Sequence, residues 1–273
     1  MSSRPRTSMS SPALARVVEL VVHRGTQRVL DGVSETLCQG EVVAIMGENG
    51  SGKTTLIEAF AGLLPLRSGD VIWAENGNSI VVRDSQGRRN QPPSMGLTLQ
   101  KGGVCGDETV MERISVSLSV AGIEHSDDQI MELLSLWGLE HRANHRLAHL
   151  SGGLRRRVAI LGGLAPAALS NSPLVVLLDE PSEGLDDSAK VILRSWIRSL
   201  SSRNHAILMA THDKDISSSA DSVLTIRDGS IEEQIGKSLG DICDLPQSGE
   251  RGNQNPVSSL VKWSVKMLSL IHI

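Results

Sequence analysis

The eight residues at positions 47–54, GENGSGKT, have the composition and spacing of a phosphate-binding loop. Their glycines allow backbone N–H groups to wrap around phosphate oxygens, and the helix predicted to follow adds a favourable dipole. Lys53 can reach the β and γ phosphates of a nucleotide, and the Thr54 hydroxyl can bind Mg²⁺. The alternative is a glycine-rich turn without a ligand, which the position between a predicted strand and a predicted helix disfavours.

A second pair of chemical groups follows an apolar run. The sequence LVVLLDEP at residues 174–181 places Asp179 and Glu180 at the end of a predicted strand. Open α/β sheets bind ligands at the carboxyl ends of their strands, so we expect both acids to lie beside the ligand. Asp179 would hold a metal ion through its water shell, and Glu180 would polarise an attacking water. The alternative is a strand end with two solvated acids.

Alternating strands and helices are predicted to position these groups. Runs rich in β-branched residues predict strands, and the run at 53–64 has helical spacing. This alternation favours parallel strands covered by helices on both faces, which is an α/β fold. An exposed loop is predicted at 83–93, and an inserted helical block at 109–150. The predicted strands cover 15–24, 27–37, 41–47, 70–73, 173–180, 205–212 and 222–233, and a further helix covers 187–202.

Composition and charge limit the function classes. The chain has 273 residues, enough for one large domain or a domain with a small insert, and 40% of them are hydrophobic. Its net charge of -4 argues against nucleic acid as the main ligand. Cys38, Cys105 and Cys243 lie far apart and lack metal-ligand spacing, which favours a reduced cytosolic compartment. Residues 1–13 do not resemble a signal peptide, and we find no apolar run long enough to cross a bilayer.

Three motifs occur in the order found in ATP-binding cassette (ABC) ATPases, the motor subunits of ABC transporters. The phosphate-binding loop is followed by LSGG at residues 150–153 and by LLDEP at residues 177–181. Three single residues also match this family. Gln100 matches the Q-loop, Asp186 ends a D-loop in SEGLD, and His212 matches the switch histidine in ATHD. The chain therefore resembles an ABC ATPase.

The resemblance covers roughly residues 15–234 and implies a P-loop NTPase core, in which a mainly parallel sheet is flanked by helices. It also implies an antiparallel β subdomain and an inserted α-helical subdomain at about residues 104–150. The composition of the remaining segments is polar, apart from an amphipathic pattern at the C-terminal end. The expected divisions are a disordered leader at 1–13, the ABC ATPase domain at 14–236, a linker at 237–258 and an amphipathic C-terminal segment at 259–273.

In this family two nucleotide-binding domains pair head to tail, and the Ser-Gly-Gly segment of each chain contacts the ATP bound to the other. The resemblance implies hydrolysis of ATP with Mg²⁺, in which Glu180 orients or deprotonates water and His212 fixes the γ-phosphate. The implied catalytic residues are Glu180, His212 and Gln100; the implied ATP contacts are Gly47, Glu48, Asn49, Gly50, Ser51, Gly52, Lys53, Thr54, Thr55 and His23; the implied contacts to the partner's ATP are Ser151, Gly152, Gly153 and Asp186; and the implied Mg²⁺ ligands are Thr54, Gln100 and Asp179.

The resemblance also implies partners. These are a second copy of the chain or a paired cassette subunit, and an integral membrane permease subunit, with the chain peripheral on the cytoplasmic face of the cell membrane. ETVMERI at residues 108–114 resembles the segment after the Q-loop in transporter ATPases, which favours the permease. The alternative is a soluble ABC-type ATPase, for example in iron–sulfur assembly. The C-terminal segment could lie on a membrane, pack on a partner or fold back on its own domain.

Several positions depart from the family pattern. The chain has no tyrosine and one phenylalanine, so His23 or Arg24 is expected where an aromatic ring usually stacks on adenine. Leu154 stands where the family usually has glutamine, and we expect a changed rate rather than a loss of activity. Arg155 and Arg156 are predicted to form a solvated helix face.

Overall fold

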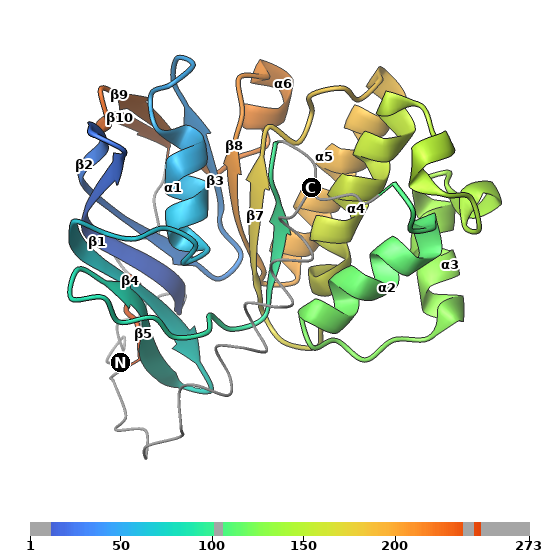
Figure 1. The fold of residues 1–273 in the computed structure, drawn as a ribbon, viewed down its shortest axis with the longest axis horizontal. Helices are drawn as coiled ribbons and strands as arrows, with labels where there is room; N and C mark the ends of the chain where they lie inside the picture. Colours follow the sequence, from blue (N-terminus) through green and yellow to red (C-terminus); the bar gives the residue numbers. More distant parts are fainter. Residues whose placement is uncertain (1–11, 101–105, 237–242, 247–273) are drawn as a thin grey trace, which may run out of the picture.

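The computed structural model describes residues 12–100, 106–236 and 243–246, and these residues form two sheets and the helices around them (Figure 1). The larger sheet has six strands in the order β10-β9-β3-β8-β7-β6. Its neighbours pair in parallel, except β10, which is antiparallel to β9. Its strands are β3 (Val42–Met46), β6 (Met95–Thr98), β7 (Val175–Asp179), β8 (Ala206–Ala210), β9 (Ser222–Arg227) and β10 (Ser230–Gly236).

The smaller sheet is antiparallel, with the strand order β2-β1-β4-β5. Its four strands alternate buried and partly exposed residues along much of their length, as expected of a sheet with one face on the core. They are β1 (Ala13–Arg24), β2 (Gln27–Cys38), β4 (Ser68–Glu75) and β5 (Asn78–Asp84).

The central strands of the larger sheet are buried on both faces. Every residue of β7 and β8 is buried, which explains why both read as continuous apolar runs in the sequence. Asp179, the last residue of β7, is the polar exception. Because β3, β7 and β8 run in the same direction, their carboxyl ends lie at one edge of the sheet.

Helices cover both faces of this sheet. Helix α1 (Lys53–Phe60) shares a hydrophobic core with the antiparallel sheet, whereas α4 (Gly152–Leu169) and α5 (Asp187–Ser202) share a second core with the helical block. In Figure 1, α1 lies on the side of β1 and β4, and α2 and α3 lie at the opposite end of the molecule. The remaining helices are α2 (Val110–Val120), α3 (Asp127–Leu136), α6 (Lys214–Ser217) and two short 3₁₀ helices, η1 (Glu140–Arg142) and η2 (Leu147–His149).

Together these elements confirm the predicted fold class, an α/β fold with a mainly parallel sheet, an antiparallel β subdomain and a helical insertion. The two longer helices of the insertion begin at capping boxes. Thr109 and Glu112 form the box of α2, and Ser126 and Gln129 form that of α3. Each box satisfies backbone N–H groups that the first helical turn leaves unpaired.

Two strands differ from the sequence prediction. Strand β5 was absent from the predicted elements, and the loop predicted at 83–93 begins too early, because Arg83 and Asp84 are the last residues of β5, which pairs with β4. Strand β6 was also absent from the predicted elements. Its four residues have no clear period, and they form a strand because they pair in register with β7, Met95 opposite Val175.

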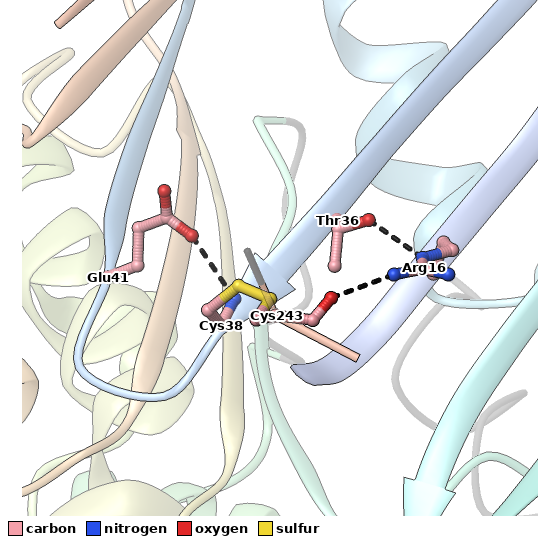
Figure 2. Close-up of a disulfide and its surroundings, with 5 residues drawn as sticks. All are labelled: Arg16, Thr36, Cys38, Glu41 and Cys243. Carbon is pink, nitrogen blue, oxygen red and sulfur yellow. Dashed lines mark hydrogen bonds between the residues drawn. A yellow bond between two sulfur atoms is a disulfide. The ribbon is translucent and has the colours of Figure 1, made fainter. Parts of the chain in front are cut away.

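The expectation that the cysteines are reduced is wrong for two of them, because Cys38 and Cys243 form a disulfide (Figure 2). Their Cα atoms lie 6.4 Å apart, although their sequence separation is 205. The N–H of Cys38 donates to Glu41, and Arg16 donates to the carbonyl of Cys243 at 3.0 Å and to the hydroxyl of Thr36 at 2.8 Å. Buried Cys243 thus anchors part of the predicted linker to the antiparallel sheet.

Several expectations fall outside the described residues. These concern the leader at 1–11, Cys105, most of the linker, and the amphipathic segment at 259–273. Strand β1 begins at Ala13, the last residue of the predicted leader. Over the described ranges, each helix is too short or too polar to cross a membrane.

Candidate active site

The phosphate-binding loop joins β3 to α1. Gly52 precedes α1 with a φ of 116°, a backbone conformation that favours glycine. A Cβ atom on Gly47 would collide with the carbonyl oxygen of Ile226, so a larger residue does not fit there. Lys53 is buried, and its Nζ donates to the carbonyl oxygens of Gly47 and Glu48 at 2.8 and 2.9 Å. The loop therefore folds around the lysine ammonium.

A cavity of about 440 Å³ opens beside this loop. This volume lies in the range of small-molecule sites, about 300–1,000 Å³. Arg24 lines the cavity and forms an ion pair with Glu58, whereas His23 is not among the lining residues. The cavity is lined by Arg24, Gln27, Val29, Asn49, Gly50, Gly52, Lys53, Thr54, Thr55, Gln100 and Glu180.

Thr54, in the first turn of α1, meets Asp179 at the end of β7. Its Oγ1 donates to Oδ2 of Asp179 at 2.9 Å. Asp179 is fully buried, and its Oδ1 has no hydrogen-bond partner among the described residues. Burial is the largest effect and raises the pKa of this carboxyl above its usual value. Hydrogen bonds from the Thr54 side chain and the Gln100 backbone lower the pKa, the charge of Glu180 raises it, and the charge of Arg156 lowers it. A cation at Oδ1 would stabilise the ionised form.

These two oxygen donors fit Mg²⁺. The ion prefers carboxylate and other oxygen ligands, and in nucleotide sites it takes one or two of them from the protein. The remaining ligands would be phosphate oxygens and water.

Glu180 follows Asp179 and contacts His212. The distance from its Oε2 to Nδ1 of His212 is 2.8 Å, and the backbone N–H of His212 donates to the same oxygen at 3.3 Å. The side chain of Glu180 is 7% exposed and that of His212 is 70% exposed. Glu180 has a φ of 47°, an unfavourable conformation for a residue with a side chain. Its N–H donates to the carbonyl of Ala210 on β8 at 2.8 Å, which holds the backbone there.

Gln100 lies two residues beyond β6, at the end of the first described segment. Its Nε2 donates to Oε2 of Glu183 at 3.0 Å. The side-chain amide therefore pairs with a carboxylate in the loop after β7 and not with Thr54 or Asp179. Both Gln100 and Glu180 line the cavity, so the Q-loop residue and the acid lie at the same opening.

The residues predicted to contact a partner's ATP do not line this cavity. Ser151 is the N-cap of α4, and its Oγ accepts from the N–H of Leu154 at 3.3 Å. A Cβ atom on Gly152 would meet open space. Asp186 is the N-cap of α5, and its carboxylate accepts from Nη2 of Arg157 at 2.6 and 2.7 Å. In a single chain, these residues lie apart from the phosphate-binding loop.

The prediction of a solvated face is wrong for Arg156, although Arg155 is exposed as expected. The guanidinium of Arg156 points into the site and donates to five main-chain carbonyl oxygens. Burial lowers the pKa of Arg156, while the nearby carboxylates oppose that shift. The acceptors are the carbonyls of Leu99 at 3.2 Å, Gln100 at 3.3 Å, Asp179 at 3.0 Å, Glu180 at 2.6 Å and Glu183 at 3.2 Å.

Sequence comparisons agree on one family. A family model described as ABC transporter matches residues 30–183. The chain is 32% identical over 228 residues to the lipoprotein-releasing system ATP-binding protein LolD of Granulibacter bethesdensis, a match that covers 81% of this chain and 97% of LolD. It is also 32% identical over 209 residues to the macrolide export ATP-binding/permease protein MacB of Psychrobacter cryohalolentis. That match covers 76% of this chain and 30% of MacB, so the chain spans less than a third of this relative.

Structural comparisons agree on the fold. An ATP-binding subunit of an ABC transporter superposes with a TM-score of 0.70 at 24% identity, covering 82% of this chain and 90% of that subunit. A dimeric bacterial ABC transporter cassette superposes with a TM-score of 0.69 at 23% identity, covering 82% of this chain and 98% of the cassette.

Proposed function

The chain belongs to the ABC transporter family as an ATP-hydrolysing cassette, and from this premise we propose how its own residues carry out hydrolysis. The meeting of Thr54 with Asp179 at 2.9 Å, next to Glu180 and His212, carries the proposal. Phosphoryl transfer to water requires a phosphate cradle, a metal ligand set and a group that orients the water. In this proposal the phosphate-binding loop with Lys53 supplies the cradle. Thr54 and Asp179 supply the metal ligands, and Glu180 with His212 orients the water.

Glu180 is the proposed catalytic base. Its carboxylate orients the attacking water and accepts a proton from it, while His212 holds that carboxylate through Nδ1. Because the imidazole is 70% exposed, its other nitrogen is free to approach the γ-phosphate from outside the cavity. Holding the base, the water and the phosphate in line supplies most of the catalysis in such reactions.

Thr54 and Asp179 would hold Mg²⁺, and Gln100, which lines the same cavity, would be a further oxygen ligand. Bound there, the ion would neutralise negative charge on the β and γ phosphates. Lys53 then exchanges the carbonyls of Gly47 and Glu48 for phosphate oxygens. The backbone N–H groups of the loop that precedes Thr55 would wrap the phosphates.

A head-to-tail homodimer completes each site in this proposal. Ser151 is the N-cap of an 18-residue helix that begins with Gly152 and Gly153. Ser151 and Gly152 are exposed, so their backbone is accessible to a second molecule. A helix N-terminus with bare glycine backbone suits a γ-phosphate. Asp186 lies on the loop that would approach the partner's site, with its own carboxylate committed to Arg157. The fold-level match to a dimeric cassette supports this pairing.

An integral membrane permease is the proposed partner outside the dimer, with the chain peripheral on the cytoplasmic face of the membrane. One relative is named for lipoprotein release, and the other combines ATP-binding with permease in its name. Affinity purification from detergent-solubilised membranes of the host tests this proposal. We expect an integral membrane protein to co-purify in stoichiometric amount. Recovery of soluble partners alone would favour an ABC-type ATPase without a transport role.

The variant Glu180→Gln tests the proposed chemistry. Loss of a positioned general base lowers kcat by about 100-fold or more, and we expect that fall here with nucleotide affinity unchanged. Glu233→Gln, an exposed acid on β10, is the matched control and should keep full activity. Wild-type turnover in Glu180→Gln would remove Glu180 from the role of base.

A further inference from the structure

Arg156 stands at the centre of main-chain carbonyls from three separate segments. These segments are the end of β6 with the Q-loop residue, the end of β7, and the loop that follows β7. A guanidinium carries five N–H donors in a fixed planar fork, and here five carbonyl oxygens receive them. Nε donates to Glu183, Nη1 donates to Leu99 and Gln100, and Nη2 donates to Asp179 and Glu180.

The shortest of these bonds, at 2.6 Å, reaches the carbonyl of Glu180. With a φ of 47°, Glu180 adopts a conformation that persists only where the surroundings hold it. Two bonds hold it from opposite sides. The N–H of Glu180 donates to Ala210 on β8, and its carbonyl accepts from Arg156 on α4. The direction of the Glu180 side chain follows from this clamped backbone.

We propose that Arg156 is the positioning residue of the catalytic base. It fixes the main chain at Glu180 so that the carboxylate stands against His212, and it does this without lining the nucleotide cavity. The same guanidinium donates to the carbonyl of Gln100, so the main chains of the Q-loop residue and of the base are held by one side chain. This inference rests on the proposed role of Glu180 as base.

No other side chain can replace this arrangement in full. Glutamine offers two N–H donors from one nitrogen, and lysine offers three donors from a single point. Neither reaches five carbonyls spread across a plane, but lysine keeps the positive charge beside the two acids. A comparison of arginine, lysine and glutamine at position 156 therefore separates the effect of the number of hydrogen bonds from the effect of the positive charge.

The experiment compares Arg156→Gln and Arg156→Lys with Arg155→Gln, which changes an exposed neighbour on the same helix by the same charge. Steady-state hydrolysis of ATP gives kcat and KM, and a fluorescent ATP analogue gives affinity. We expect Arg156→Gln to lower kcat by about 10- to 100-fold, as a misplaced catalytic group does, with KM and affinity within about twofold. Arg156→Lys should recover part of the loss, and Arg155→Gln should match the wild type.

A double-variant cycle shows whether Arg156 acts through Glu180. Single-turnover hydrolysis is measured for Glu180→Gln alone and combined with Arg156→Gln. If Arg156 only positions the base, the second substitution lowers the residual rate no further. A further fall of the full single-variant size would overturn the inference, as would wild-type kcat in Arg156→Gln. If that variant does not fold, Arg156→Lys decides, and wild-type kcat in it overturns the inference.

The two proposals fail separately. Wild-type turnover in Glu180→Gln would defeat the assignment of the base, whatever Arg156 does. An inactive Glu180→Gln together with a fully active Arg156→Gln would defeat the positioning role alone.

Discussion

Oε2 of Glu180 lies 2.8 Å from Nδ1 of His212, although 32 residues separate them in the chain. Both residues come just after neighbouring strands, since β7 and β8 pair in parallel with Asp179 opposite Ala210. The register of the sheet therefore brings the acid and the histidine together. Just beyond the strand ends, the N–H of Glu180 donates to Ala210 and the N–H of Thr211 donates to Ile45. The pairing of the two apolar strands β7 and β8 therefore places the proposed base next to His212.

Replacing His212 by alanine is expected to lower kcat by about 100-fold, because Glu180 loses the group that orients its carboxylate. KM for ATP should stay within about twofold, since His212 does not line the cavity. Steady-state hydrolysis measures both constants. His141→Ala, at an exposed position of the helical block, is the control and should behave as the wild type. A raised KM with unchanged kcat would instead assign His212 to nucleotide binding.

Replacing Arg24 by alanine is expected to raise KM for ATP by about threefold, as loss of an exposed cation–π contact would. Arg24 lines the cavity, whereas His23 does not, so His23→Ala should leave KM unchanged. A guanidinium plane stacks on any base, and we expect GTP to be hydrolysed at least about one tenth as well as ATP. The opposite pattern, with only His23→Ala raising KM, would identify His23 as the residue that stacks on adenine.

Removing the disulfide with Cys38→Ser is expected to lower the free energy of unfolding by about 2–4 kcal/mol, because a cross-link restricts the unfolded chain. Denaturation in buffer without reductant measures this difference. Dithiothreitol should bring the wild type to the value of the variant and leave the variant unchanged. Cys105→Ser keeps both bonded cysteines and serves as the control. Equal stability of Cys38→Ser and wild type in oxidising buffer would show that the bond contributes nothing.

His205 is expected to make stability depend on pH. Burial lowers the pKa of His205 from 6.5 to about 4, and its Nδ1 accepts from the N–H of Leu174 at 3.0 Å, which a protonated nitrogen cannot do. Between these two pKa values the unfolded chain binds more protons than the folded chain. The contribution of His205 to stability is therefore fully present above pH 6.5 and is lost as the pH falls toward 4.

The loss should be about 2 kcal/mol once solvent screening is allowed for. Urea denaturation at pH 7.5 and at pH 4.5, about the ends of this window, gives the difference for the wild type and for His205→Gln. The variant should lose less stability on acidification. An equal loss in both proteins would place the pH dependence elsewhere.

The chemical groups could be predicted from the sequence because each lies in a short contiguous motif. Lys53 and Thr54 belong to one loop between a strand and a helix, and Asp179 and Glu180 end an apolar strand. Local rules decide those conformations, and the parallel sheet then brings the motif ends together. The contact between Thr54 and Asp179 depends both on these local conformations and on the arrangement of strands in the sheet.

Arg156 could not be predicted in this way. Helix α4 buries every residue from Val158 to Ala167, so its apolar pattern does not tell which of the preceding arginines points inward. The carbonyls that bind Arg156 come from segments that only the tertiary fold assembles. The bond between Cys38 and Cys243 is similar, because their spacing of 205 residues carries no signal. Strand β6 likewise depends on its pairing with β7.

The most direct test of a head-to-tail ATPase is the mass of Glu180→Gln in solution, measured by light scattering with and without ATP and Mg²⁺. If hydrolysis needs Glu180 and ATP lies between two chains, blocked hydrolysis traps the pair. We expect twice the chain mass of 29.2 kDa with ATP, and the mass of one chain without it. A single-chain mass with ATP bound would contradict the composite site.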